Sequence, residues 1–374
     1  MSNPEGVGVR IPLWLDCDPG HDDACAILLS IYHPALRILG ISTVNGNAPL
    51  GKVTRNALSV LEAIGATEVP VYAGASIPFC REIRSAPEVH GESGLAGTEL
   101  LPDPTCKAQS GSAVNAMRDA LLSCPPNSAW LVAVGPLTNI ALLFAMYPEV
   151  AAHVKGLSVM GGAVGNGFAP EIYLGPPYVD ESGKTQDRCG NYTPFAEFNV
   201  WADPESARSV FLIPELKQKT FLIPLDVSHQ AYTTKKARQL LLHGNKGVTR
   251  LRAMFNELFI YVAGTYEDAW GMDDGAPLHD PLAVALILAD YPDPEIRIDF
   301  DDNNGERWSV DVVLSGLEEG RTIVTKLKEG TPGVLIPRSL DVNKFWLTLE
   351  SCMAKADEKT GYVKLSPPRG HAKL

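Results

Sequence analysis

The first 75 residues alternate between short apolar segments and amphipathic ones. Apolar runs at 10–16, 36–44 and 69–74 have the length and composition of buried strands, and apolar residues recur at helical spacing over 22–33 and 52–65. The resulting order of strand, helix, strand, helix, strand is typical of a parallel sheet covered by helices. We therefore predict an α/β protein.

The same alternation resumes after this region. Further helices are expected at 112–124, 136–148, 202–211, 278–290 and 341–356, and further strands at 128–135, 154–162 and 219–227. Residues 307–341 alternate in the manner of antiparallel strands. We therefore expect a mostly parallel, open, Rossmann-like sheet with helices on both faces and a small antiparallel patch near the C-terminus.

The residues between about 167 and 190 are rich in Gly, Pro and Asp and have no helical period. We interpret them as an insertion, with a hairpin as one form it can take, because a capped helix follows directly. The 374 residues are predicted to form one domain, with a core of about 11–355 and a flexible tail at about 359–374.

The composition argues against several classes of protein. A net charge of −12 is unusual for a nucleic-acid or anionic-membrane binder. The seven cysteines are scattered without a CxxC pair, which indicates neither a zinc site nor a disulfide framework. There is no apolar stretch of secretory-signal type and no apolar run of membrane-spanning length. We expect a cytoplasmic protein.

Four aspartates fall within eight residues at the end of the first predicted strand, in "DCDPGHDD": Asp16, Asp18, Asp22 and Asp23. Ligands of open α/β sheets bind outside the carboxyl ends of the strands. A tight turn at Pro19-Gly20 would let the carboxylates converge, and converging oxygens suit Ca²⁺ or Mg²⁺. The simpler alternative is a solvated loop that caps the following helix.

Other short motifs carry weaker signals when each is taken alone. His279 and Asp280 precede a proline and an apolar helix, which also fits a simple N-cap. Glu197 and Asn199 are two residues apart, so in extended chain they face one way and could both bind a polyol. His90 lies in the glycine-flanked "HGESG".

Taken in order, the motifs "DCDPGHDD", "HGESG", "VGPLTNIA", "MGGA", "AEFNVWADPESA" and "HDPLAVA" resemble the nucleoside N-ribohydrolase family. The resemblance runs from about residue 11 to beyond 288. It is closest to the inosine/uridine-preferring type, which includes fungal uridine ribohydrolases. It implies hydrolysis of ribonucleosides to free base and ribose, a bound Ca²⁺ and a homo-oligomer, either a dimer or a tetramer.

The resemblance also implies roles for individual residues. The Ca²⁺ ligands would be Asp18, Asp23, the Val134 carbonyl and Asp280. The ribose would contact Asp22, Asn47, Met160, Asn191, Glu197 and Asn199. For Asn191, the alternative is Asn166, on the other side of the insertion. At the base, His279 would act as the acid, with His90 and two residues of the loop "AGTYEDAWGMDDG", Tyr266 and Trp270, as further contacts. Asp16 would support the cluster from the strand end.

The chemistry of glycosidic cleavage gives these carboxylates a purpose. Cleavage passes through a ribosyl cation, which surrounding carboxylates stabilise, and a metal makes a bound water more acidic. Asp18 is the predicted general base. The acidic "AWGMDDGAP" before His279 suggests a cationic base, such as that of nicotinamide riboside, as a further substrate hypothesis.

Two alternatives remain open from the sequence. "LDCD" also fits a Mg²⁺-dependent phosphatase that acts on nucleotides, with Asp16 as nucleophile. The other alternative is a nucleoside-binding protein that has lost catalysis.

Overall fold

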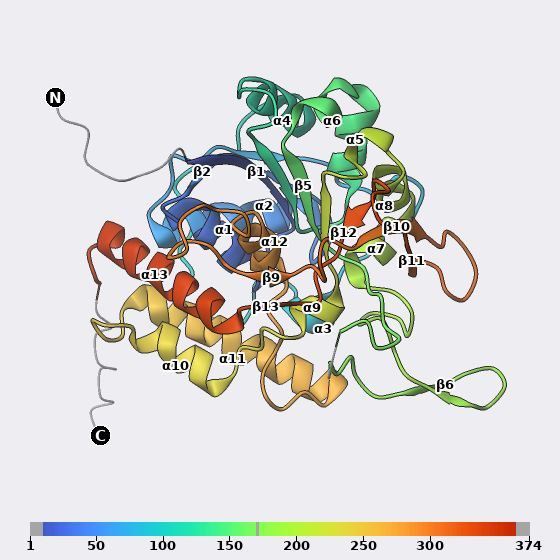
Figure 1. The fold of residues 1–374 in the computed structure, drawn as a ribbon. Coiled ribbons are helices and arrows are strands. Elements are labelled where there is room, and N and C mark those ends of the chain that lie inside the picture. The colour runs from blue at the N-terminus through green and yellow to red at the C-terminus, as the bar shows by residue number, and fades with distance from the viewer. Residues whose placement is uncertain (1–9, 170–171, 364–374) are drawn as a thin grey trace.

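The computed structural model describes residues 10–169 and 172–363. Their main feature is a sheet of nine strands (Figure 1). Its order is β11 (Thr322–Lys326), β10 (Arg307–Val312), β12 (Val334–Leu335), β8 (Thr220–Ile223), β5 (Gly156–Met160), β4 (Trp130–Ala133), β1 (Ile11–Cys17), β2 (Leu36–Thr43) and β3 (Val71–Ala73). The strands from β12 through β8 to β3 are parallel. This confirms the predicted fold class.

Strand β1 lies in the middle of the sheet because both of its faces are apolar. Leu13, Leu15 and Cys17 belong to the core on one face, and Trp14 belongs to the core on the other. The chain runs outward from β1 through β2 to β3, and then returns to pair β4 with the opposite edge of β1. The direction of winding therefore reverses between β1 and β4, which is where open α/β sheets bind their ligands.

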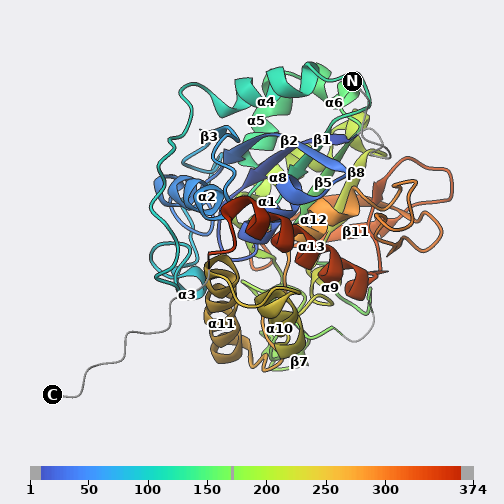
Figure 2. The same ribbon diagram turned by 90° about the vertical axis from the view of Figure 1, so that its left-hand side faces the viewer.

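Helices cover both faces, and Figures 1 and 2 show α4 to α6 on one side of the sheet and α13 on the other. One face is covered by α1 (Asp23–Tyr32), α2 (Leu50–Ile64), α12 (Asp280–Leu286) and α13 (Val342–Thr360). The other is covered by α4 (Ala113–Leu122), α5 (Thr138–Met146), α6 (Glu149–His153) and α8 (Pro204–Phe211). The remaining helical segments are α3 (Pro87–His90), α7 (Phe198–Ala202), the 3₁₀ helix η1 (Pro214–Leu216), α9 (Leu225–Ser228), α10 (Lys235–His243) and α11 (Arg250–Trp270).

The predicted antiparallel patch is present, but it extends the main sheet. Strand β10 pairs antiparallel with β11 and β12, and β12 continues the sheet in parallel with β8. A short pair, β9 (Phe300–Asp301) with β13 (Ser339–Leu340), lies beside it. Since one sheet takes strands from residue 11 to residue 335, the prediction of a single domain has physical support.

The insertion contains the hairpin named among its expected forms. Strands β6 (Tyr178–Val179) and β7 (Thr185–Gln186) pair antiparallel. Residues 170–171 of the insertion, and 364–374 of the predicted flexible tail, lie outside the described residues. Helix α13 runs to Thr360, two residues into the stretch that we assigned to the tail.

Two local predictions were wrong. The strand expected over 219–227 ends at Ile223, and 225–228 form helix α9 instead. The stretch 263–270, read as part of a loop before His279, is the end of the 21-residue helix α11. The helix could have been predicted, because its buried apolar residues recur at helical spacing: Leu251, Met254, Phe255, Leu258, Phe259, Val262 and Tyr266.

A buried ion pair fastens α11 to α13. Arg252 and Asp357 are 2% and 1% exposed, and Nε of Arg252 lies 2.5 Å from Oδ2 of Asp357. The hydroxyl of Thr249 donates to the other oxygen of this carboxylate at 2.6 Å.

Replacing Asp357 by alanine should lower the free energy of unfolding by about 3 kcal/mol, because a guanidinium is left buried without its main partner. Chemical denaturation followed by circular dichroism measures the change. Glu358→Ala is the matched control, since Glu358 pairs with Lys246 in solvent at 3.6 Å. Equal losses in the two variants would contradict this account of Asp357.

Candidate active site

A pocket lies at the carboxyl ends of β1, β2, β4 and β5, where the winding reverses. It is lined by most of the residues that the sequence singled out: Asp22, Asn47, His90, Val134, Met160, Asn191, Glu197, Asn199, Tyr266, Trp270, His279 and Asp280. Asp18 and Asp23 do not line it, and are buried next to residues that do. Asn166, the alternative to Asn191, lines a different cavity beside the insertion.

The turn between β1 and α1 is organised by the carboxylate of Asp23. The backbone N–H groups of Asp18 and Gly20 donate to it at 3.1 and 2.8 Å. The side-chain amide of Asn47 donates to it at 3.3 Å. The Pro-Gly turn therefore folds back onto the start of the helix, as the sequence suggested.

Asp18 is enclosed by backbone. Its Oδ2 accepts a hydrogen bond from the backbone of Asn47 at 2.8 Å, whereas its buried Oδ1 has no partner among residues 10–169 and 172–363. A Cβ at Gly46 would lie 2.0 Å from Oδ2, and one at Gly135 would lie 2.6 Å from Oδ1. These two glycines therefore make room for a carboxylate that still has an oxygen to offer.

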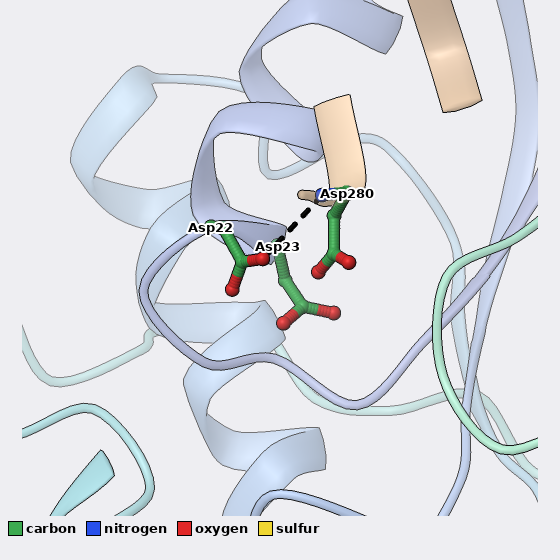
Figure 3. A group of neighbouring side chains, drawn as sticks. All are labelled: Asp22, Asp23 and Asp280. Atoms are coloured by element: carbon green, nitrogen blue, oxygen red, sulfur yellow. Dashed lines mark hydrogen bonds between the residues drawn. The ribbon is translucent and has the colours of Figure 1, made fainter. Parts of the chain in front are cut away.

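Three carboxylates converge at the pocket floor. One oxygen each of Asp22, Asp23 and Asp280 lies within 4.8 Å of the others, and Figure 3 shows the three side chains pointing the same way from α12 and the start of α1. The backbone N–H of Asp280 donates to Asp22 at 3.4 Å. Asp22, which we had expected at the ribose, thus lies with two predicted metal ligands.

This donor set fits a hard divalent cation. It consists of converging carboxylates and the unpartnered Oδ1 of Asp18. Among the described residues, the lining of the pocket includes no lysine or arginine that could neutralise them. The Val134 carbonyl accepts a hydrogen bond from the Asn199 side chain at 2.8 Å, and a carbonyl oxygen has a second lone pair for another partner.

Burial disfavours the charged form of these carboxylates. It raises the pKa of Asp23 to about 7, with a further contribution from neighbouring Asp22. It also raises the pKa of Asp18 and Asp280 well above their usual values, again with the help of nearby carboxylates. A bound cation would offset both effects.

Asp16 takes no part in the convergence. It accepts hydrogen bonds from Ser42 and from the side chain of Asn139, the latter at 2.7 Å, and it is fully buried. Burial raises its pKa to about 7. Asp16 therefore ties β1 to its neighbours, in keeping with the supporting role expected of it.

Glu197 and Asn199 form a polar wall. Glu197 caps α7 by accepting from the backbone of Asn199 and Val200 at 2.8 and 3.0 Å, and from Gly162 at 2.9 Å. Burial raises its pKa to about 7. Asn191 also braces this helix, because its side-chain oxygen accepts from the backbone of Phe198 at 3.1 Å.

His279 bridges two hydroxyl groups. Its Nδ1 lies 2.7 Å from the Ser228 hydroxyl, and its Nε2 lies 3.1 Å from the Tyr266 hydroxyl. Burial lowers the pKa of His279 to about 3, so the ring is neutral near pH 7. Ser228 was missed because it directly follows 219–227, the stretch that was read as a strand, whereas 225–228 form α9.

Trp270 closes the same side of the pocket. Its ring centroid lies 4.6 Å from that of Tyr266, one turn earlier on α11. Its indole N–H donates to the Asn191 carbonyl at 3.1 Å. The end of α11 therefore joins the aromatic side of the pocket to the polar wall.

Known proteins resemble this chain over most of its length. The family model described as inosine-uridine preferring nucleoside hydrolase matches residues 13–347. The chain is 37% identical to the uridine nucleosidase of Saccharomyces cerevisiae, covering 93% of this chain and 97% of that protein. It is also 37% identical to the pyrimidine-specific ribonucleoside hydrolase RihA of Salmonella arizonae, covering 75% and 80%.

A solved structure agrees with these relatives. The purine-preferring ribonucleoside hydrolase from Gardnerella vaginalis matches with a TM-score of 0.74 at 25% identity, covering 92% of this chain and 98% of that one.

The raised pKa values predict how the stability of the metal-free protein depends on pH. Asp23 and Glu197 bind protons more tightly when folded, so their contribution is complete below about pH 4 and is lost as the pH rises through about 7. A divalent cation should therefore raise the thermal unfolding midpoint more at pH 7.5 than at pH 5. Thermal scans with Ca²⁺ or with chelator measure this.

The exposed Asp273 provides the control. Asp273→Asn should retain the full cation effect, and Asp23→Asn should lose most of it. A cation-induced rise that is as large at pH 5 as at pH 7.5 would contradict the prediction.

Proposed function

Because the chain belongs to the inosine-uridine preferring nucleoside hydrolase family, we propose that it cleaves uridine- and inosine-type ribonucleosides in a Ca²⁺-dependent reaction, and prefers uridine. The observation that carries the proposal is the convergence of Asp23 with Asp22 and Asp280, two residues that line the same pocket as His279. The uridine preference is supported by the relatives named for uridine and for pyrimidine ribonucleosides.

The polar wall and floor would hold the ribose. Asn47, Asn191, Glu197 and Asn199 offer amide and carboxylate groups to its hydroxyls, and the thioether of Met160 lies 3.6 Å from the Asn199 amide. These oxygens face the sugar ring, where positive charge develops as the bond to the base breaks. Their negative charge therefore stabilises the transition state more than the bound nucleoside.

Asp18 would accept the proton of the attacking water. It has an oxygen without a partner and a pKa raised by burial, both of which suit a general base. When bound by Asp18, Asp23, Asp280 and the Val134 carbonyl, Ca²⁺ would lower the pKa of the water and orient it. Asp22, close to this set, would bind a ribose hydroxyl or join the ligands.

At the departing base, His279 would act as a neutral hydrogen-bonding group between Ser228 and Tyr266. With its two nitrogens between these hydroxyls, the neutral ring would accept from Ser228 and donate to the oxygen of Tyr266, which leaves the Tyr266 hydroxyl free to donate a hydrogen bond to the departing base. Tyr266 and Trp270 offer aromatic surface to the base. A cationic base, as in nicotinamide riboside, remains a substrate hypothesis that rests on the acidic segment before His279.

The nucleotide phosphatase alternative loses support on geometry. Its nucleophile would be Asp16, which is fully buried, is held by Ser42 and Asn139, and does not line the pocket. The other alternative, a nucleoside-binding protein without catalysis, can be tested only by measuring nucleoside hydrolysis.

Three expectations from the sequence stay predictions. They are the choice of Ca²⁺ over other divalent cations, the homo-oligomer and the cytoplasmic location. Among the described residues, none of the helices has the length and apolar character that crossing a membrane requires.

The purified protein should release free base and ribose from uridine fastest, and chelator should abolish the release until Ca²⁺ is restored. The panel consists of uridine, cytidine, inosine, adenosine and nicotinamide riboside, assayed for ribose by reducing-sugar detection. Binding without release from any of them would favour the silent protein. Inosine turnover above that of uridine would overturn the preference.

Asp18→Asn should lower kcat by roughly 10³-fold or more, because the general base is lost, while nucleoside still binds. Single-turnover assays and calorimetric titration separate the two effects. Asp273→Asn, an exposed acidic change outside the pocket, is the control. Unchanged turnover in Asp18→Asn would remove Asp18 from this role.

A further inference from the structure

Two buried histidines contact each other at the edge of the pocket. His21, inside the aspartate motif, is 2% exposed, and His90, at the end of α3, is 9% exposed. Their Nδ1 atoms lie 3.1 Å apart, and Nε2 of His21 lies 2.9 Å from the Ala96 carbonyl oxygen. The His21 ring also stacks on Tyr261, with centroids 5.4 Å apart and planes within 5°. The mechanism above leaves His21 unused.

The contact between His21 and the Ala96 carbonyl determines where the ring protons of both histidines lie. A carbonyl oxygen only accepts, so Nε2 of His21 must carry a proton. In a neutral His21 ring, Nδ1 is then an acceptor, and the hydrogen bond to His90 requires the proton on Nδ1 of His90. A neutral His90 is therefore left with a lone pair on Nε2.

The surroundings favour the neutral pair. Both rings are buried, and within the described residues neither ring has a carboxylate as hydrogen-bond partner. Burial disfavours a charge on either ring, and two charged rings whose Nδ1 atoms lie 3.1 Å apart would repel each other and could not form this hydrogen bond. Among the described residues, Nε2 of His90 has no hydrogen-bond partner. This atom is also not fully buried. Since His90 lines the pocket, this atom is open to a ligand there.

We propose that His21 is a positioning residue that holds His90 in its Nδ1–H tautomer, so that His90 presents an accepting Nε2 to the substrate. The proposal rests on the proposed function for the identity of that substrate. It follows that the nucleoside group facing His90 is a hydrogen-bond donor. In uridine, this donor is either a ribose hydroxyl, of which the 5′-hydroxyl is one, or the ring N3–H of the base.

The tautomers can be observed directly in the Ca²⁺-loaded protein. Long-range ¹H–¹⁵N spectra of histidine-labelled protein distinguish protonated from unprotonated ring nitrogens, and His90→Phe and His21→Phe assign the two residues. The expected result is protonated Nδ1 in His90 and protonated Nε2 in His21. Protonated Nε2 in His90 would overturn the proposal, whether or not any nucleoside is hydrolysed. Absence of hydrolysis by the parent protein would instead refute the proposed function.

A double-mutant cycle tests whether His21 acts through His90. His21→Phe keeps a ring against Tyr261 but removes the acceptor, and should lower kcat/KM for uridine by roughly tenfold, about the effect of one hydrogen bond. In a His90→Phe background the same change should have almost no further effect. Additive losses would mean that His21 acts independently, and would overturn the proposal.

Tyr261→Phe is the matched control, because it keeps the stacked ring and should leave kcat/KM unchanged. Two analogues identify the donor. 5′-Deoxyuridine lacks one hydroxyl and 3-methyluridine lacks the N3–H. The analogue that lacks the relevant donor should lose roughly tenfold in kcat/KM in the parent protein and little in His90→Phe. If these two analogues, and likewise 2′-deoxyuridine and 3′-deoxyuridine, each lose equally in the two proteins, no group of uridine donates to His90, and the proposal fails.

Discussion

Two backbone N–H groups, those of Asp18 and Gly20, point at the carboxylate of Asp23. This contact closes the turn after β1, and much of the pocket depends on it. It brings the side chain of Asp18 under the pocket, and it directs the start of α1 toward Asp280 on α12. Oxygens of Asp22, Asp23 and Asp280 then lie within 4.8 Å of one another, so the turn concentrates negative charge at this point.

Other contacts help to accommodate these buried carboxylates. Asn47 donates from its backbone to Asp18 and from its side chain to Asp23. Gly46 and Gly135 leave no Cβ where the carboxylate of Asp18 lies. Burial raises the pKa of both carboxyl groups, that of Asp23 to about 7, and a bound cation would counteract this effect. Metal binding, protonation and the stability of the turn are thus one linked equilibrium.

The sequence predicted the parts of the site that depend on local chain geometry. Asp18, Asp22 and Asp23 could be assigned together because a Pro-Gly turn at a strand end leaves few other arrangements. Tyr266 could be named, but not its setting, because the last turns of α11, which contain Gly264 and the acidic pair Glu267 and Asp268, were read as a loop. Ser228 and the pairing of His21 with His90 depend on tertiary contacts between distant segments, for which a single sequence carries no signal.

Helix α11 spans about 31 Å from end to end, at the usual rise per residue. One end is fastened to α13 by the buried pair of Arg252 and Asp357, and the other end carries Tyr266 and Trp270. A rigid-body rotation of this helix would have to break that buried ion pair. We therefore expect the base to leave through side-chain rotations of Tyr266 and Trp270, without movement of the whole helix. The rate of base release should then not change when residues near Arg252 are replaced, provided that the ion pair with Asp357 stays intact.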